Sequence, residues 1–205
     1  MVNKLLILLL LSVSVFAQSN IDKLRNTISE INTGFLYSNL PDENKLQLIE
    51  TTLSLIESSE REKIDITEVR SEFFNYKELL KHEQNVDSLK KAFRSVNNRF
   101  NSVAYNYFYD KLIKSSKQKI LVFSTSMSCE CTLEMCYQQE VEVQKFCKEN
   151  NYEYAVIDTW EDFEIQQKFK VGFVPTVILL DPDNNELKRF TRMENLYPQL
   201  SSLVN

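Results

Sequence analysis

The chain has 205 residues, and its 24 lysines and arginines against 29 aspartates and glutamates give a formal net charge of -5. This acidic balance, with no basic cluster in the sequence, disfavours nucleic-acid binding, which depends on lysine and arginine contacts to phosphate. Gly34 and Gly172 are the two glycines, so the usual glycine-rich phosphate loops are excluded and a nucleotide cofactor is disfavoured.

Residues 1–17 have the pattern of a secretory signal peptide. Lys4 precedes an apolar run of about 12 residues, and Val15 and Ala17 are small residues at the spacing that signal peptidase recognises. The run is shorter than the ~20 residues that span a bilayer, and no second run follows it. We therefore expect an exported protein, periplasmic in a Gram-negative bacterium and otherwise secreted, which begins near Gln18 and has no membrane span. Export permits disulfides between its cysteines.

Residues 18–105 have the apolar periodicity of helices. Apolar residues recur there at alternating spacings of three and four, which is typical of helices packed side by side. We predict four helices in a small bundle or hairpin array, marked by apolar stripes at 21–31, 46–56, 66–80 and 86–103. Nothing in this all-α region indicates a function. His82 has no cysteine, histidine or paired carboxylate near it in the sequence, and we interpret it as a surface residue.

From residue 119 the pattern changes to alternating strands and helices. We predict strands at 119–125, 152–158, 174–181 and 186–191, and helices at about 131–150, 160–171 and 193–204. The turn residues at 182–185 favour an antiparallel hairpin between the last two strands. The order β-α-β-α-β-β-α predicts an α/β fold, with a mixed sheet, helices on both faces and parallel pairs made by the two crossovers.

This order, a strand that leads into a cysteine-bearing helix start, and the sequence Val174-Pro175-Thr176 together resemble the thioredoxin fold. The resemblance covers about residues 106–205, with a helix at about 107–114 before the first core strand. In the family this proline has a cis peptide bond and lies beside the active cysteines. The resemblance therefore implies a cis Val174–Pro175 bond and places Pro175 in the active site, with Val174 and Thr176 at the substrate-binding edge.

The cysteine motif departs from the family pattern. Cys129 falls at the position of the family's nucleophilic cysteine, but Thr132 occupies the place of the second cysteine of Cys-x-x-Cys, and the additional cysteine is Cys131. Ser128 replaces the usual tryptophan, and Phe123 stands where the family has a buried acid. Thioredoxin activity therefore does not follow from the resemblance alone.

Cys129 suits a nucleophile. A thiol just before a helix faces unpaired backbone N–H groups and the positive end of the helix dipole, and both favour the thiolate. Glu130 opposes this with a nearby negative charge, and an inert buried thiol is the alternative. Cys131 has three interpretations: a resolving cysteine that closes a strained ring, a second soft-metal ligand, or a helix-start thiol without a role.

Cys136 and Cys147 fall on the core side of the predicted helix. Cys136 is two turns from Cys129, or ~10 Å within one regular helix, so a disulfide between them needs Cys129 outside the helix and a bend toward Cys136. Cys136 and Cys147 are three turns apart, too far for each other. With Leu133 and Val143 they form a plausible core stripe, which makes Cys147 structural and leaves Cys136 open as an additional redox or metal ligand.

Soft-metal binding is the main alternative function. Three thiols and two thioethers lie within ten residues, and such ligands suit Cu(I): Met127, Cys129, Cys131, Met135 and Cys136. We predict that the protein carries out thiol–disulfide exchange with exported proteins that have thiols or disulfides. This function needs no cofactor. A retained fold that serves as an interaction module without redox turnover is the third candidate.

Overall fold

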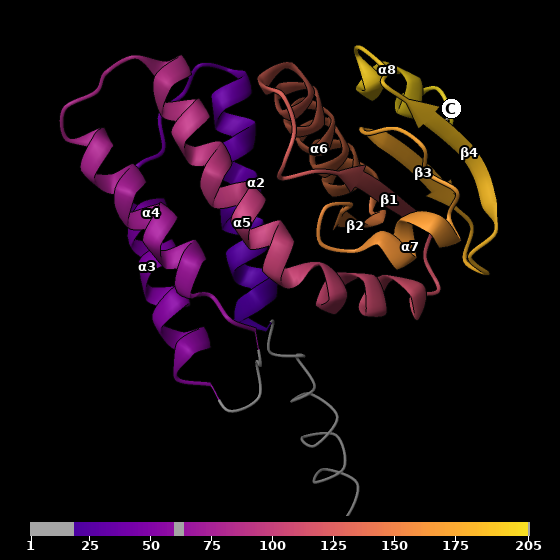
Figure 1. Ribbon diagram of the computed structural model, residues 1–205, viewed down its shortest axis with the longest axis horizontal. Helices are drawn as coiled ribbons and strands as arrows, with labels where there is room; N and C mark the ends of the chain where they lie inside the picture. Colours follow the sequence, from indigo (N-terminus) through magenta and orange to yellow (C-terminus); the bar gives the residue numbers. More distant parts are fainter. Residues whose placement is uncertain (1–18, 60–63, 205) are drawn as a thin grey trace, which may run out of the picture.

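The structure is a computed structural model that describes residues 19–59 and 64–204. A helical N-terminal region is followed by a sheet with helices on both faces (Figure 1). The predicted signal peptide, residues 1–17, lies outside the described residues. Among the helices that are described, none has both the length and the apolar character needed to cross a membrane.

Within the described residues the N-terminal region contains α2 (Asn20–Leu36), α3 (Glu43–Glu57), α4 (Thr67–Leu80) and α5 (Val86–Ile113). Side chains of Ser19, Asp42 and Asn85 accept a hydrogen bond from a backbone N–H of the first turn of α2, α3 and α5, respectively.

Helix α5 corrects one prediction. The stripe at 86–103 and the separate helix expected at about 107–114 are one continuous helix of 28 residues. No glycine or proline interrupts this stretch, and the buried apolar stripe continues through Ala104, Phe108 and Leu112. The boundary expected at residue 105/106 therefore lies inside a helix that runs on without a break.

The sheet of the described residues has the order β2-β1-β3-β4, formed by β1 (Lys119–Ser124), β2 (Glu153–Asp158), β3 (Thr176–Leu180) and β4 (Glu186–Thr191). Strands β1 and β2 are parallel, whereas β3 is antiparallel to both β1 and β4. The predicted mixed sheet and its hairpin are confirmed.

The expectation that both crossovers make parallel pairs is wrong for the second one. Helix α6 (Glu130–Asn150) has 21 residues, so at 1.5 Å per residue its length of about 30 Å carries the chain back past β1. Helix α7 (Phe163–Lys168) has 6 residues and is only about 9 Å long, against about 20 Å for a six-residue strand. The chain therefore enters β3 from the end at which it left β2.

The two faces of the sheet have separate cores. One face packs against α6 and α8 (Leu196–Ser201), through a cluster that includes Ile120, Val122, Val156, Val177 and Leu179. The other face belongs to a larger cluster that also contains the helical region, and its strand residues are Leu121, Phe123, Ala155, Ile157, Ile178 and Leu180.

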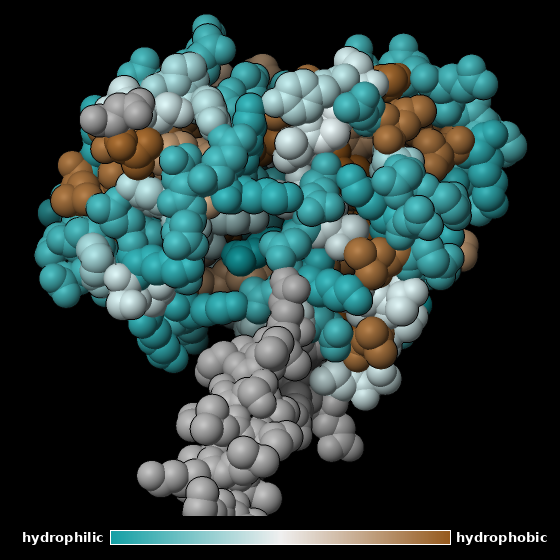
Figure 2. All heavy atoms as spheres, turned by 180° about the vertical axis from the view of Figure 1, so that it is seen from behind, coloured by the Kyte–Doolittle hydropathy of each residue, from teal (hydrophilic) through white to brown (hydrophobic). Residues whose placement is uncertain are grey.

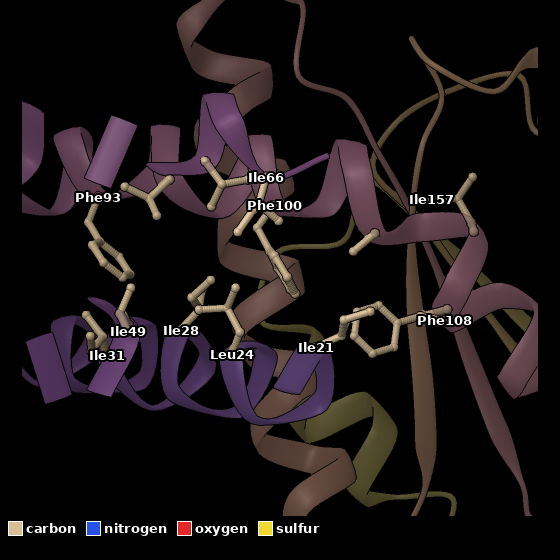
Figure 3. Packing of buried hydrophobic residues seen from close by; sticks show 14 of the residues in the cluster. Ile21, Leu24, Ile28, Ile31, Ile49, Ile66, Phe93, Phe100, Phe108 and Ile157 are labelled. Carbon is tan, nitrogen blue, oxygen red and sulfur yellow. The ribbon is translucent and has the colours of Figure 1, made fainter. Parts of the chain in front are cut away.

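The larger cluster joins the helical region to the sheet. Figure 3 shows Ile28 and Leu24 of α2 packed below Phe100 of α5, with Phe108 of α5 between α2 and the strand that carries Ile157. The helical N-terminal region and the sheet thus share one hydrophobic core. The face seen in Figure 2 is mainly hydrophilic, with hydrophobic side chains in small separate groups.

Candidate functional site

Cys129 lies at the N-terminus of α6, after the loop that leaves β1. Its backbone is extended (φ -65°, ψ 154°), and its carbonyl accepts hydrogen bonds from the backbone N–H groups of Thr132 and Leu133. The preceding loop is held by Asp158 at the end of β2, whose carboxylate accepts from the Ser126 N–H at 3.1 Å. The Cys129 side chain is exposed, as the predicted nucleophile position requires.

Cys129 and Cys131 form a close pair of thiols. Their sulfur atoms lie 2.8 Å apart, and the Cys129 Sγ is 3.2 Å from the Thr132 hydroxyl. Both cysteines are free and exposed. Cys131 lies in the first turn of α6, at the start of the helix predicted at about 131–150. Residues two apart in a helix do not face each other, and the two thiols meet because Cys129 is still outside the helix.

This arrangement favours the Cys129 thiolate. Interactions with the Cys131 thiol, the Thr132 hydroxyl and the Thr132 backbone N–H, in that order, lower the pKa of Cys129 to about 6. A thiol with this pKa is largely ionised at neutral pH, and the thiolate is the nucleophilic form.

Cys136 and Cys147 are buried in α6, on the side away from the exposed pair. Burial raises the pKa of Cys136 to about 12, and the nearby Glu140 carboxyl adds to the shift. Cys147 packs in the same cluster as Val143, and burial raises its pKa as well. Both thiols are therefore protonated at neutral pH and have the environment of core residues.

The residues that a soft metal would need are not gathered in one place. Met127 is exposed, Met135 is half-buried, and Cys136 is buried away from Cys129 and Cys131. Among the described residues, no three histidine, cysteine, aspartate or glutamate side chains are placed to hold a metal ion together. The structure thus brings two of the five suggested ligands within sulfur contact of each other.

The Val174–Pro175 peptide bond is cis, as predicted. Thr176 pairs with Phe123 in the β1–β3 register, so the start of β3 and the end of β1 lie at the same end of the sheet. Pro175 and Thr176 are buried, and the Thr176 hydroxyl donates to the Phe173 carbonyl at 2.7 Å. The accessible part of this edge is therefore Val174, which is half-buried, and Phe173, which is exposed.

Large apolar side chains are exposed at this end of the sheet, three in loops and one, Phe163, at the start of α7. Met127 follows β1, Trp160 and Phe163 follow β2, and Phe173 precedes β3. Because β1 and β2 are parallel and β3 is antiparallel to them, these three loops leave or enter the sheet at one end. We call these four side chains the apolar rim.

A polar contact between α5 and α6 was missed in the sequence. Lys90, Arg94, Asn97 and Asn101 follow one another at spacings of four, three and four along α5. Each of them bonds to a glutamate of α6, namely Glu130, Glu134 or Glu140. The signal for this contact is the helical spacing of these four polar residues, which form a second stripe on α5 next to its apolar stripe.

Glu140 is the buried end of that contact. Its carboxyl accepts hydrogen bonds from the side-chain amides of Asn97 and Asn101, both at 2.8 Å, and from the Ser124 hydroxyl of β1. Burial raises its pKa to about 7. A buried acid therefore lies on α6 next to β1, and it bonds to both β1 and α5.

The region from β1 to α8 has a thioredoxin-like fold, with its parallel β1-α6-β2 unit, its central β1 and β3 strands and its cis-proline. No protein-family model matches the sequence, and no curated protein matches it. Solved structures similar to the chain include thioredoxin 1 from Thermosipho africanus, with 28% identity over 42% of this chain and 90% of that chain and a TM-score of 0.36. Fasciola hepatica thioredoxin has 22% identity over 47% and 88% of the two chains, with a TM-score of 0.38. A mutant thioredoxin from Halobacterium salinarum has 18% identity over 47% and 79%, with a TM-score of 0.40.

Proposed function

We propose that the chain carries out thiol–disulfide exchange with exported proteins, with Cys129 as the nucleophile and Cys131 as the resolving cysteine. The observation that carries this proposal is the exposed pair of thiols, 2.8 Å apart at the start of α6. The pattern of residues 1–17 supports export, and an oxidising compartment is where exchange between protein disulfides is needed.

The exchange takes two steps. The Cys129 thiolate attacks one sulfur of a substrate disulfide, and a mixed disulfide forms while the first substrate sulfur leaves as a thiolate. The Cys131 thiolate then attacks the Cys129 sulfur and releases the second substrate thiolate. The substrate gains two electrons, and the protein is left with a Cys129–Cys131 disulfide. The reverse sequence would oxidise a substrate dithiol.

The substrate would bind at the end of the sheet where the site lies. The apolar rim offers contact surface to an unfolded or extended polypeptide, and the cis-proline loop adds the half-buried Val174 next to Phe173 of the rim. Pro175 and Thr176 are buried, so we assign them the support of this edge rather than direct contact with substrate.

The test is to equilibrate the purified protein in glutathione buffers of increasing oxidised fraction, quench with acid, alkylate the remaining thiols and map the peptides by mass spectrometry. We expect a reversible link between Cys129 and Cys131, with Cys136 and Cys147 reduced throughout. A Cys129–Cys136 link would move the resolving role to Cys136. Thiols that stay reduced in every buffer would contradict the proposal.

Cu(I) binding is the second candidate, favoured by the proximity of two exposed thiols with the exposed thioether of Met127 in the preceding loop. It predicts that Cu(I) protects Cys129 and Cys131 from alkylation and that glutathione buffers do not link them. An interaction module without redox turnover predicts that Cys129→Ser leaves function unchanged, whereas exchange and metal binding both require this thiol.

A further inference from the structure

Arg94 of α5 binds two carboxylates in the first two turns of α6. Its guanidinium donates to the Glu130 carboxylate at 2.6 Å and to the Glu134 carboxylate at 2.9 Å. The Arg94 side chain is only 6% exposed. Arginine keeps its charge under all ordinary conditions, and its planar fork suits two carboxylates at once.

Glu130 depends on Arg94 more than Glu134 does. Glu134 also pairs with Lys90 at 2.6 Å. The other cation that pairs with Glu130 among the described residues is Lys91, at 3.4 Å, and the Lys91 side chain is 65% exposed. Exposed ion pairs of this kind contribute little. The Arg94 hydrogen bond is accordingly the largest influence that lowers the pKa of Glu130.

Glu130 lies in the sequence between the two cysteines of the pair. An unpaired carboxylate next to Cys129 opposes ionisation of that thiol, because like charges at short range disfavour the charged form. Paired with the buried guanidinium of Arg94, the same carboxylate loses most of this effect.

We propose that Arg94 is a positioning residue of the cysteine site, which holds the first turn of α6 against α5 and cancels the charge of Glu130 beside Cys129. Its consequence for exchange rests on the function proposed above. The inference gives the helical N-terminal region a role, since this region supplies the cation on which the site depends.

The test measures the rate at which iodoacetamide alkylates Cys129 as a function of pH, with the labelled cysteine identified by peptide mapping. Arg94→Met leaves Glu130 with Lys91 alone, and we expect the midpoint of the profile to rise by roughly half a unit to one unit. Glu130→Gln removes the carboxylate and leaves Arg94, so its midpoint should fall. The double variant Arg94→Met with Glu130→Gln should return close to the parent.

The matched control is Arg99→Met. Arg99 lies on the same helix, and a shallow pocket is lined by Arg94, Arg99 and Glu130 together, but Arg99 pairs with Glu68 of α4. The alkylation midpoint of Arg99→Met should equal that of the parent. Arg94→Lys, which keeps the charge and loses the fork, should fall between the parent and Arg94→Met.

If the role of Arg94 is merely structural, the alkylation midpoint of the double variant should be shifted as much as that of Arg94→Met. This result would overturn the proposal. If Arg94→Met does not fold, Glu130→Gln decides alone, and an unchanged midpoint in that surface variant counts against the proposal. Alkylation of Cys129 does not require thiol–disulfide exchange. The role of Arg94 can therefore be supported even if the proposed function is wrong, and it can be contradicted even if the proposed function is right.

Discussion

The Glu140 carboxyl of α6 accepts a hydrogen bond from the Ser124 hydroxyl of β1 at 2.5 Å, and both side chains are buried. The same carboxyl accepts from Asn97 and Asn101 of α5, so one titratable group connects the helical region, the cysteine helix and the central strand. Asp158 and the Cys136 thiol also face this group.

The first prediction concerns stability and pH. Burial raises the pKa of Glu140 from 4.5 to about 7, so the neutral acid stabilises the folded chain fully below pH 4.5. This contribution is lost as the pH rises through about 7. At 1.36 kcal/mol per unit the shift corresponds to about 3 kcal/mol as an upper value. Urea unfolding across this pH range should show the decline.

Glu140→Gln should remove this decline. The amide resembles the neutral acid, because its oxygen can accept from both asparagines while its nitrogen donates to the Ser124 hydroxyl. The control is Glu149→Gln, an exposed acid on the same helix, which should keep the pH profile of the parent. A profile that declines equally in Glu140→Gln would assign the pH dependence to another group.

The second prediction concerns the shared core. Phe100 of α5 is 1% exposed and belongs to the cluster that joins the helical region to the sheet. Phe100→Ala should lower the free energy of unfolding by about 3–5 kcal/mol. Phe74→Ala on α4, where the ring is 58% exposed, should cost less than about 1 kcal/mol.

One core also predicts one transition. Far-UV circular dichroism, dominated by the helices, and hydrogen exchange of the β1 amides should give coincident unfolding curves. Separate transitions for the helices and for the sheet would show that the two regions fold independently and that the cluster does not couple them.

Most elements of the fold could be predicted from the sequence because each depends on local periodicity. The stripes of α2 to α4, the β-branched runs of the strands and the turn at 182–185 are signals of this kind. The continuity of α5 was missed because the thioredoxin resemblance suggested a separate helix at 107–114. The direction of β3 was missed because it depends on the length of α7 relative to a strand.

The parts of the site that could be predicted are those that depend on a residue's position within one helix or strand. Cys129 at the start of α6 and the cis bond before Pro175 are local features. Arg94 bonds to Glu130, 36 residues along the chain, and Glu140 bonds to Asn101 and Asn97, 39 and 43 residues away. No local pattern specifies which glutamate a distant helix will meet. Buried polar partners of this kind become visible only in three dimensions.

The third prediction concerns processing. The arrangement of Lys4, the apolar run and the small residues at Val15 and Ala17 predicts cleavage before Gln18. N-terminal sequencing of the exported protein should begin within a few residues of Gln18, and a chain without residues 1–17 should stay in the cytoplasm. An intact Met1 end in the membrane fraction would show that the segment is an anchor.

The last prediction concerns the division of labour between the cysteines. If Cys131 resolves the mixed disulfide, Cys131→Ser should trap Cys129 in covalent complexes with partner proteins, because the second step has lost its thiolate. Loss of the Cys131 thiol also removes the largest influence that lowers the pKa of Cys129. The experiment is therefore done at about pH 8, where the Cys129 thiolate remains substantially populated.

The complexes are detected as bands on non-reducing gels that disappear on reduction, and peptide mapping identifies the linked cysteine. Cys147→Ser is the control: Cys147 is buried in the core on the other face of α6 and should change stability without trapping partners. Trapping in Cys136→Ser and not in Cys131→Ser would assign the resolving role to Cys136. This outcome would require α6 to open at its first two turns, because Cys136 is buried and burial raises its pKa to about 12.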